Sequence, residues 1–140
     1  MAFNPVSPED FARISNLMGR YQYLVDAGDE EGWVDLFTED GAFQGLGPEA
    51  DEQFRGREGL KGVVRMNVGN GGGRMRHNMV SLSAEYGDTT DEAHARYYMI
   101  GAITPPGQPT QVAIQVDVHT HLVRVGGEWK IRTNHMTQLA

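Results

Sequence analysis

The stretch RYQYLVDAGDEEGW, residues 20–33, ends one helix and begins another. Gly28 is expected to end the first helix, because glycine readily adopts the left-handed conformation that closes helices. Asp29 can cap a second, short helix over EEGWVDLF, residues 30–37. Asp26 falls in the last turn of the first helix, where unpaired carbonyl groups destabilise a negative charge. Asp26 is therefore either a solvated helix end or a base placed there for chemistry.

The start of this first helix is marked by SPED, residues 7–10. Ser7 is the predicted N-cap, Pro8 the first helical residue, and Asp10 the acidic third position of a capping box. An apolar stripe then recurs at helical spacing, and two leucines widen it. Its members are Phe11, Ile14, Leu17, Met18, Tyr21, Leu24 and Val25.

The middle of the chain mixes short elements. EDGAFQG, residues 39–45, predicts a turn and a short strand, and GREGLKGVVRMNV, residues 56–68, predicts a helix with Leu60, Val63 and Val64 on one face. GNGGG, residues 69–73, predicts a mobile loop, because glycine loses much backbone entropy when it is ordered. QGLGPEADEQF, residues 44–54, is expected near a pocket mouth.

From residue 76 onward the hydrophobic period changes to two, which indicates β-strands. The predicted strands cover residues 76–86, 92–104, 110–125 and 129–139. Helices followed by an antiparallel meander predict an α+β fold with the helices on one face of the sheet. A strongly curved sheet closed by helices forms a cone with an interior pocket, and such pockets are usual ligand sites.

Composition narrows the class of protein. The chain has 140 residues, 39% of them hydrophobic and 22% charged, which predicts one globular domain over residues 1–140. A net charge of −7 argues against nucleic acid and anionic membranes as partners. Cysteine is absent, which rules out thiolate metal sites. No signal peptide pattern or long apolar run is present, so a cytoplasmic location is expected.

Histidines on the third long strand raise the question of a metal site. His119 and His121 are two residues apart and point to the same face, so they could chelate zinc. The preferred interpretation is a polar outer face of the sheet or a subunit contact, and no metal or cofactor is expected. His94 and His135 are interpreted as surface or wall residues.

The order of several motifs resembles the SnoaL-like branch of the NTF2-like superfamily. The motifs are RYQYLVDAGDEEGWVDLFTEDG, FRGREGL, RMRHNMVSL and HLVRVGGEWKI, and together they span nearly the whole chain. The resemblance implies a cone-shaped α+β barrel with a long N-terminal helix across the mouth of a strongly bent sheet. It also implies a homodimer or higher homo-oligomer.

Members of that branch include scytalone dehydratase, bile acid 7α-dehydratase, a dehydrochlorinase, polyketide cyclases and ketosteroid isomerases. The resemblance implies that Asp26 and His77 form a base dyad and that Tyr21 assists them. Two departures stand out. A further acid or histidine of some dehydratases falls near Gly101 or Ala102, and an arginine of the bile acid enzyme falls near Gln138.

The sequence thus predicts a cofactor-free lyase or isomerase, dehydratase-like in its chemistry. His77 is expected to take the proton, Asp26 to orient its imidazole, and Tyr21 to donate a hydrogen bond to a substrate oxygen. The expected substrate is a small apolar polycyclic or aromatic hydroxy or keto compound, with residues 69–73 as a lid over it. Two alternatives are a non-catalytic binding or dimerisation module of the same fold and a metal enzyme that uses His119 and His121.

Overall fold

The structure, a computed structural model, describes residues 2–45 and 53–138, so most of the expected pocket-mouth segment 44–54 lies outside the described residues. Within these ranges three helices and a six-stranded sheet follow one another along the chain. In order they are α1 (Pro8–Ala27), α2 (Glu30–Val34), β1 (Phe37–Gln44), β2 (Gln53–Arg55), α3 (Gly56–Gly71), β3 (Met75–Tyr86), β4 (Glu92–Ile103), β5 (Gln111–Val125) and β6 (Glu128–Gln138).

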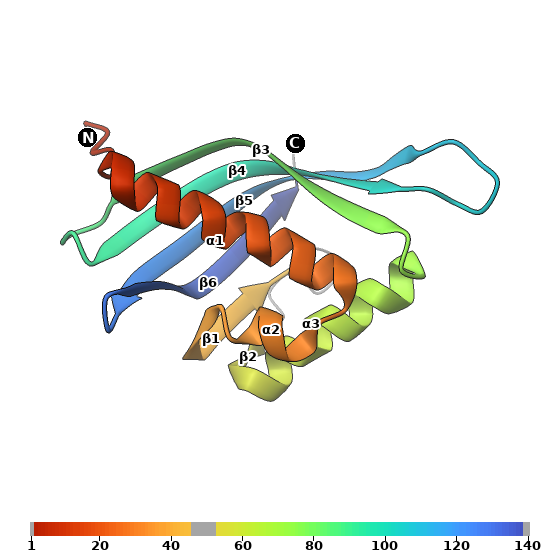
Figure 1. Cartoon of the computed structure of the whole chain (residues 1–140), viewed down its shortest axis with the longest axis horizontal. Coiled ribbons are helices and arrows are strands. Elements are labelled where there is room, and N and C mark those ends of the chain that lie inside the picture. Colours follow the sequence, from red (N-terminus) through yellow and green to blue (C-terminus); the bar gives the residue numbers. More distant parts are fainter. Residues whose placement is uncertain (1, 46–52, 139–140) are drawn as a thin grey trace.

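The strands form one sheet in the order β2-β1-β6-β5-β4-β3. Neighbouring strands are antiparallel, except that β1 runs parallel to β6. Figure 1 shows the long strands curving together, with α1 lying across one face and α2 and α3 on the same side. The α+β prediction, with helices gathered on one face of a curved sheet, is confirmed.

Helix α1 has the ends that its sequence predicts. The Ser7 hydroxyl accepts a hydrogen bond from the Asp10 backbone N–H at 3.1 Å, and Gly28 closes the helix with φ 72°. Four members of the apolar stripe, Ile14, Met18, Tyr21 and Val25, are buried, and the two leucines pack against the core partly buried. Phe11 begins the stripe at the margin of the buried face and is 39% exposed.

Two predicted boundaries are corrected by the structure. Helix α2 ends at Val34, and Phe37 opens β1 instead of closing the helix. The predicted loop over residues 69–73 is wrong in its first half, because α3 continues to Gly71 before Gly72 turns left-handed. A β-carbon on Gly71 would lie 2.8 Å from the Met75 β-carbon, so close packing against β3 requires glycine there.

Bulges in two strands exchange their buried and exposed faces. In β3 the register shifts between Val80 and Ser83, where Ser81 has φ 60°. In β6, Ile131 pairs with Leu122 but Thr133 pairs with His121, so one extra residue is inserted. A bulge moves later side chains to the other face of a strand. Simple alternation counted from the start of either strand therefore fails beyond its bulge.

Asp10 ties the start of α1 to the sheet. Its side chain is only 9% exposed, and the Arg124 guanidinium donates to both carboxylate oxygens at 2.9 and 3.0 Å. The Trp129 indole N–H donates at 3.1 Å and the Tyr86 hydroxyl at 2.5 Å. The hydrogen-bonded Arg124 is the main cause that holds the pKa of Asp10 well below its usual value. The expected return bond of a capping box is absent, because the Ser7 N–H donates to Tyr86 instead.

No helix in the described ranges is both long and apolar enough to cross a membrane.

Asp10→Asn tests the attachment of α1 to the sheet through the Asp10 carboxylate. The amide cannot accept both Arg124 bonds and places an N–H against the guanidinium, so the free energy of unfolding at pH 7 should fall by about 3 kcal/mol. Chemical denaturation measures the change. Glu9→Gln is the matched control, since Glu9 is exposed and its pairing with Arg13 should contribute little.

The lowered pKa of Asp10 also predicts how the difference in stability between wild type and Asp10→Asn depends on pH. Its stabilising effect is complete above the unfolded-state pKa, about 3.9, and is lost as pH falls through the lower folded-state value. The stability gap between wild type and Asp10→Asn should therefore shrink below about pH 4. A gap that stays constant down to pH 2 would contradict this account.

Candidate functional site

A cavity of about 550 Å³ lies between the helices and the inner face of the sheet. Its wall is mainly apolar and aromatic and contains four methionines, with a small number of polar groups. The apolar and aromatic lining is Val25, Trp33, Phe43, Phe54, Val63, Met66, Met75, Met99, Ile114, Val118 and Met136, and the polar lining is Tyr21, Gln22, Asn67, Asn70, His77, Tyr97 and Asn134. This combination is typical of a small-molecule site.

The structure brings Asp26 and His77 together, as the sequence analysis expected. Asp26 comes from the last turn of α1 and His77 from the start of β3. One carboxylate oxygen of Asp26 lies 2.5 Å from Nδ1 of the His77 ring, and the other accepts the His77 backbone N–H at 3.0 Å. The side chains are 9% and 15% exposed. The carboxylate at this unfavourable helix position thus gains two N–H partners that offset the repulsion of the helix carbonyls.

The contact with Asp26 fixes the role of each nitrogen of His77. A carboxylate only accepts, so Nδ1 is assigned as the donor, and the neutral ring keeps its lone pair on Nε2. His77 lines the cavity, whereas Asp26 does not. Asp26 thus stands behind the ring, in the position of a group that orients a base, and the Nε2 lone pair is available to accept a proton.

Tyr21 lies in the same cavity with its hydroxyl held from the sheet side. The Asn134 side-chain N–H donates to the Tyr21 hydroxyl at 2.9 Å, and Asn134 in turn accepts from Thr120. Burial raises the pKa of Tyr21 well above its usual value. The phenol therefore stays protonated at neutral pH, and its own O–H is the group that can donate to a bound molecule.

Three further polar groups complete the site. Gln22 donates to the Tyr97 hydroxyl at 3.3 Å, and burial is the main cause that raises the pKa of Tyr97 to about 12. Among the described residues, the side-chain oxygen of Gln22 and the indole N–H of Trp33 have no hydrogen-bond partner although both are buried. Both residues line the cavity.

Sequence reasoning missed Gln22, Tyr97 and Asn134. Gln22 is four residues from both Met18 and Asp26, so a helical wheel places the three residues on the same side of the helix and could have identified Gln22. Tyr97 lies between outward-facing Arg96 and Tyr98, and strand alternation predicts its burial. Asn134 gave no such signal, because the β6 bulge turns it inward.

Gly101, one of the noted departures, lies opposite the candidate base, whereas the other histidines lie away from the cavity. Gly101 pairs with His77 across β3 and β4, and a β-carbon there would lie 2.6 Å from the Ile114 side chain, so a larger residue would require Ile114 to move. His94 lies on β4, and His119 and His121 lie on β5. His135 on β6 pairs with His119 on the outer face of the sheet. None of these four histidines lines the cavity.

Residues 7–135 match the model of the SnoaL-like domain family, and the chain belongs to that family. A search of curated proteins gave no match.

Solved structures share the fold. Aln2 from a Streptomyces species superposes with TM-score 0.85 at 22% identity, over 96% of this chain and 94% of Aln2. An NTF2-like protein with a cystatin-like fold from Novosphingobium aromaticivorans gives 0.80 at 20% identity, over 94% and 82% of the two chains. A protein provisionally described as a scytalone dehydratase, from the same organism, gives 0.75 at 18%, over 94% and 85%. At these identities the likeness establishes the fold alone.

Asp26→Asn is expected to reverse the His77 tautomer. The oxygen of the new amide side chain must still accept the His77 backbone N–H, so its N–H faces Nδ1, which then becomes the acceptor and leaves the proton on Nε2. Long-range ¹H–¹⁵N NMR of the ring reads this directly. The His119 and His135 rings serve as controls in the same spectrum, and an unchanged His77 tautomer would contradict the assignment.

Proposed function

We propose that this chain is a lyase or isomerase of the dehydratase type, in which His77 abstracts a proton next to a carbonyl group. The observation that carries the proposal is the Asp26–His77 pair at the wall of an apolar cavity, with no hydrogen bond to Nε2 from any residue in the described ranges. An ordinary solvated helix end would not hold a histidine by both its backbone and its ring. Membership of the SnoaL-like family and the description of the Novosphingobium neighbour agree with this chemistry.

The proposed reaction uses three residues of the chain. Nε2 of His77 takes a proton from the carbon beside a carbonyl, and the C–H electron pair moves toward the carbonyl oxygen to form an enolate. The Tyr21 O–H donates to that oxygen, and Asp26 stabilises the imidazolium. When the enolate re-forms the carbonyl, its electron pair forms a double bond between the deprotonated carbon and the next carbon along, and the hydroxyl on that next carbon leaves as water with the proton from His77.

The cavity sets the class of substrate. A volume of about 550 Å³ is within the usual range for small organic ligands, and its walls are mainly apolar, with several aromatic rings and four methionine side chains. Methionine adapts its shape to flat and irregular partners alike. An apolar polycyclic or aromatic hydroxy ketone fits these walls, with its oxygens directed to Tyr21 and His77.

A second candidate is a non-catalytic module that binds the same kind of molecule. The observation in its favour is Gly101, which leaves no acid or base on β4 opposite His77. A dehydration that needs a second proton donor would then depend on His77 alone or on Tyr21. The two candidates differ in whether a bound ligand is changed.

The test begins with thermal-shift selection of binders from a panel of aromatic and polycyclic ketones and β-hydroxy ketones. Binders are then incubated with the protein in D₂O, and proton exchange beside the carbonyl and loss of water are followed by NMR. His77→Gln should lower the rate by about 10²–10⁴-fold, and Tyr21→Phe by about 10²–10³-fold, with binding retained. His135→Gln on the outer face is the matched control and should leave the rate unchanged.

If ketones bind to wild type and to His77→Gln alike, and neither protein exchanges or dehydrates them, the catalytic proposal fails and the binding module takes its place.

A further inference from the structure

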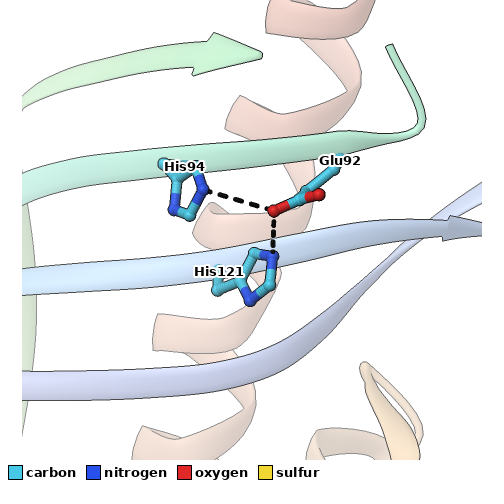
Figure 2. A group of neighbouring side chains, drawn as sticks. All are labelled: Glu92, His94 and His121. Carbon is cyan, nitrogen blue, oxygen red and sulfur yellow. Dashed lines mark hydrogen bonds and ion pairs between the residues drawn. The ribbon is translucent and has the colours of Figure 1, made fainter. Parts of the chain in front are cut away.

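A cluster of metal-ligating side chains stands on the outer face of the sheet, away from the cavity. Figure 2 shows Glu92 and His94 on β4 and His121 on β5 pointing toward one another. Along β4, Ala93, Ala95 and Tyr97 are buried in the core, so the residues that alternate with them project from the opposite face. The cluster is therefore separate from the proposed active site and does not depend on the proposed function.

Strand pairing explains why these three residues meet, and it distinguishes them from His119 and His121, the pair weighed as a metal site from the sequence. Residues two apart on a strand, such as His119 and His121, have their α-carbons about 6.5–7 Å apart. His94 and His121 instead pair directly across β4 and β5, a position where β-carbons are about 4.5–5.5 Å apart. Glu92 is two residues before His94 on the same face, and its carboxylate lies beside Nε2 of both rings.

The ligand atoms have a spacing that suits a single ion. Oε1 of Glu92 lies 2.9 Å from Nε2 of His121 and 3.5 Å from Nε2 of His94. One ligand atom from each residue lies within 4.8 Å of the others. Ligands of a tetrahedral zinc ion with bonds of 2.0–2.2 Å are about 3.3 Å apart, so small side-chain adjustments bring all three atoms to bonding distance.

The neighbouring residues hold the ligands in a suitable state. Nδ1 of His94 lies 3.2 Å from Nε2 of His119, which lets His94 donate through Nδ1 and keep a lone pair on Nε2. Such a hydrogen bond from the second nitrogen is the usual support of a metal-bound histidine. The His94 and His121 rings are stacked, with an interplanar angle of 6° and centroids 4.7 Å apart, which limits their rotation.

The charge around the Glu92, His94 and His121 cluster and its exposure to solvent also permit a cation to bind there. The nearby Arg96 guanidinium is paired with Asp117 at 2.6 Å, so its charge is compensated. The side chains of Glu92, His94 and His121 are 30%, 33% and 24% exposed, so an ion can enter from solvent. A transition-metal ion of intermediate hardness, such as Zn²⁺, suits two imidazoles and one carboxylate better than Ca²⁺ or Mg²⁺, which prefer oxygen ligands.

We propose that Glu92, His94 and His121 form a binding site for a divalent transition-metal ion, with Zn²⁺ as its reference ligand and water in the fourth position. Strands β4 and β5 are already paired through backbone hydrogen bonds, and the ion would link them through side chains as well. Because the site exists only in the folded chain, bound Zn²⁺ should raise the thermal stability of the protein.

The experiment uses the full-length, tag-free protein after treatment with a chelator. Calorimetric titration with Zn²⁺ should give one ion per chain, and Zn²⁺ should raise Tm. Glu92→Gln and His121→Ala should each abolish the saturable binding and the Tm rise. His119→Ala, which removes only the supporting bond, should weaken binding by about 10–100-fold. His135→Ala, a histidine on the same face outside the cluster, is the matched control and should bind as wild type does.

Circular dichroism of each variant establishes that it is folded, and Glu92→Gln is the conservative variant should His121→Ala not fold. The proposal is overturned if wild type shows no saturable Zn²⁺ binding, or if Glu92→Gln binds as wild type does. It is also overturned if His135→Ala reduces binding as much as loss of a proposed ligand, since the ion would then bind to the outer face without a defined site.

Discussion

The carboxylate of Asp10 is the contact on which the placement of α1 depends. It accepts hydrogen bonds from Arg124, Trp129 and Tyr86, which come from three different strands. A buried carboxylate is stable only when such partners replace its water. Because those partners exist only when β3, β5 and β6 are in register, the helix and the sheet fix one another. The start of α1 is thereby held at one end of the curved sheet.

The far end of α1 is held by a second carboxylate, that of Asp26, at the proposed active site. Asp26 holds the backbone and ring of His77 at the start of β3. Between the two ends, the same helix directs Tyr21 and Gln22 toward the cavity. A helix fixed at both ends can set the distance between a base and a hydrogen-bond donor, which a loop would do less well. The position of the cavity groups thus follows from the attachment of α1.

Sequence patterns predicted the elements better than the contacts between them. Gly28, Ser7 and Asp29 mark helix ends through local backbone chemistry, so their roles could be read directly. Asn134 could not be assigned because the β6 bulge reverses its face, and the close packing of Gly71 against Met75 depends on the position of β3. The roles of Asp10 and of the His94–His121 pair depend on residues far apart in sequence, which only strand register brings together. The expected closeness of Asp26 and His77 came from family resemblance, since no local pattern links residues so far apart in the chain.

The central claim is that His77 faces a bound ketone with Nε2 while Tyr21 holds the ketone oxygen. A crystal structure of the protein with a non-reactive aromatic ketone selected from the binding panel tests it most directly. The account predicts the carbon beside the carbonyl within about 3.5 Å of His77 Nε2 and the carbonyl oxygen within hydrogen-bond distance of the Tyr21 hydroxyl. A ketone bound in the cavity with its carbonyl turned away from both residues would contradict the account.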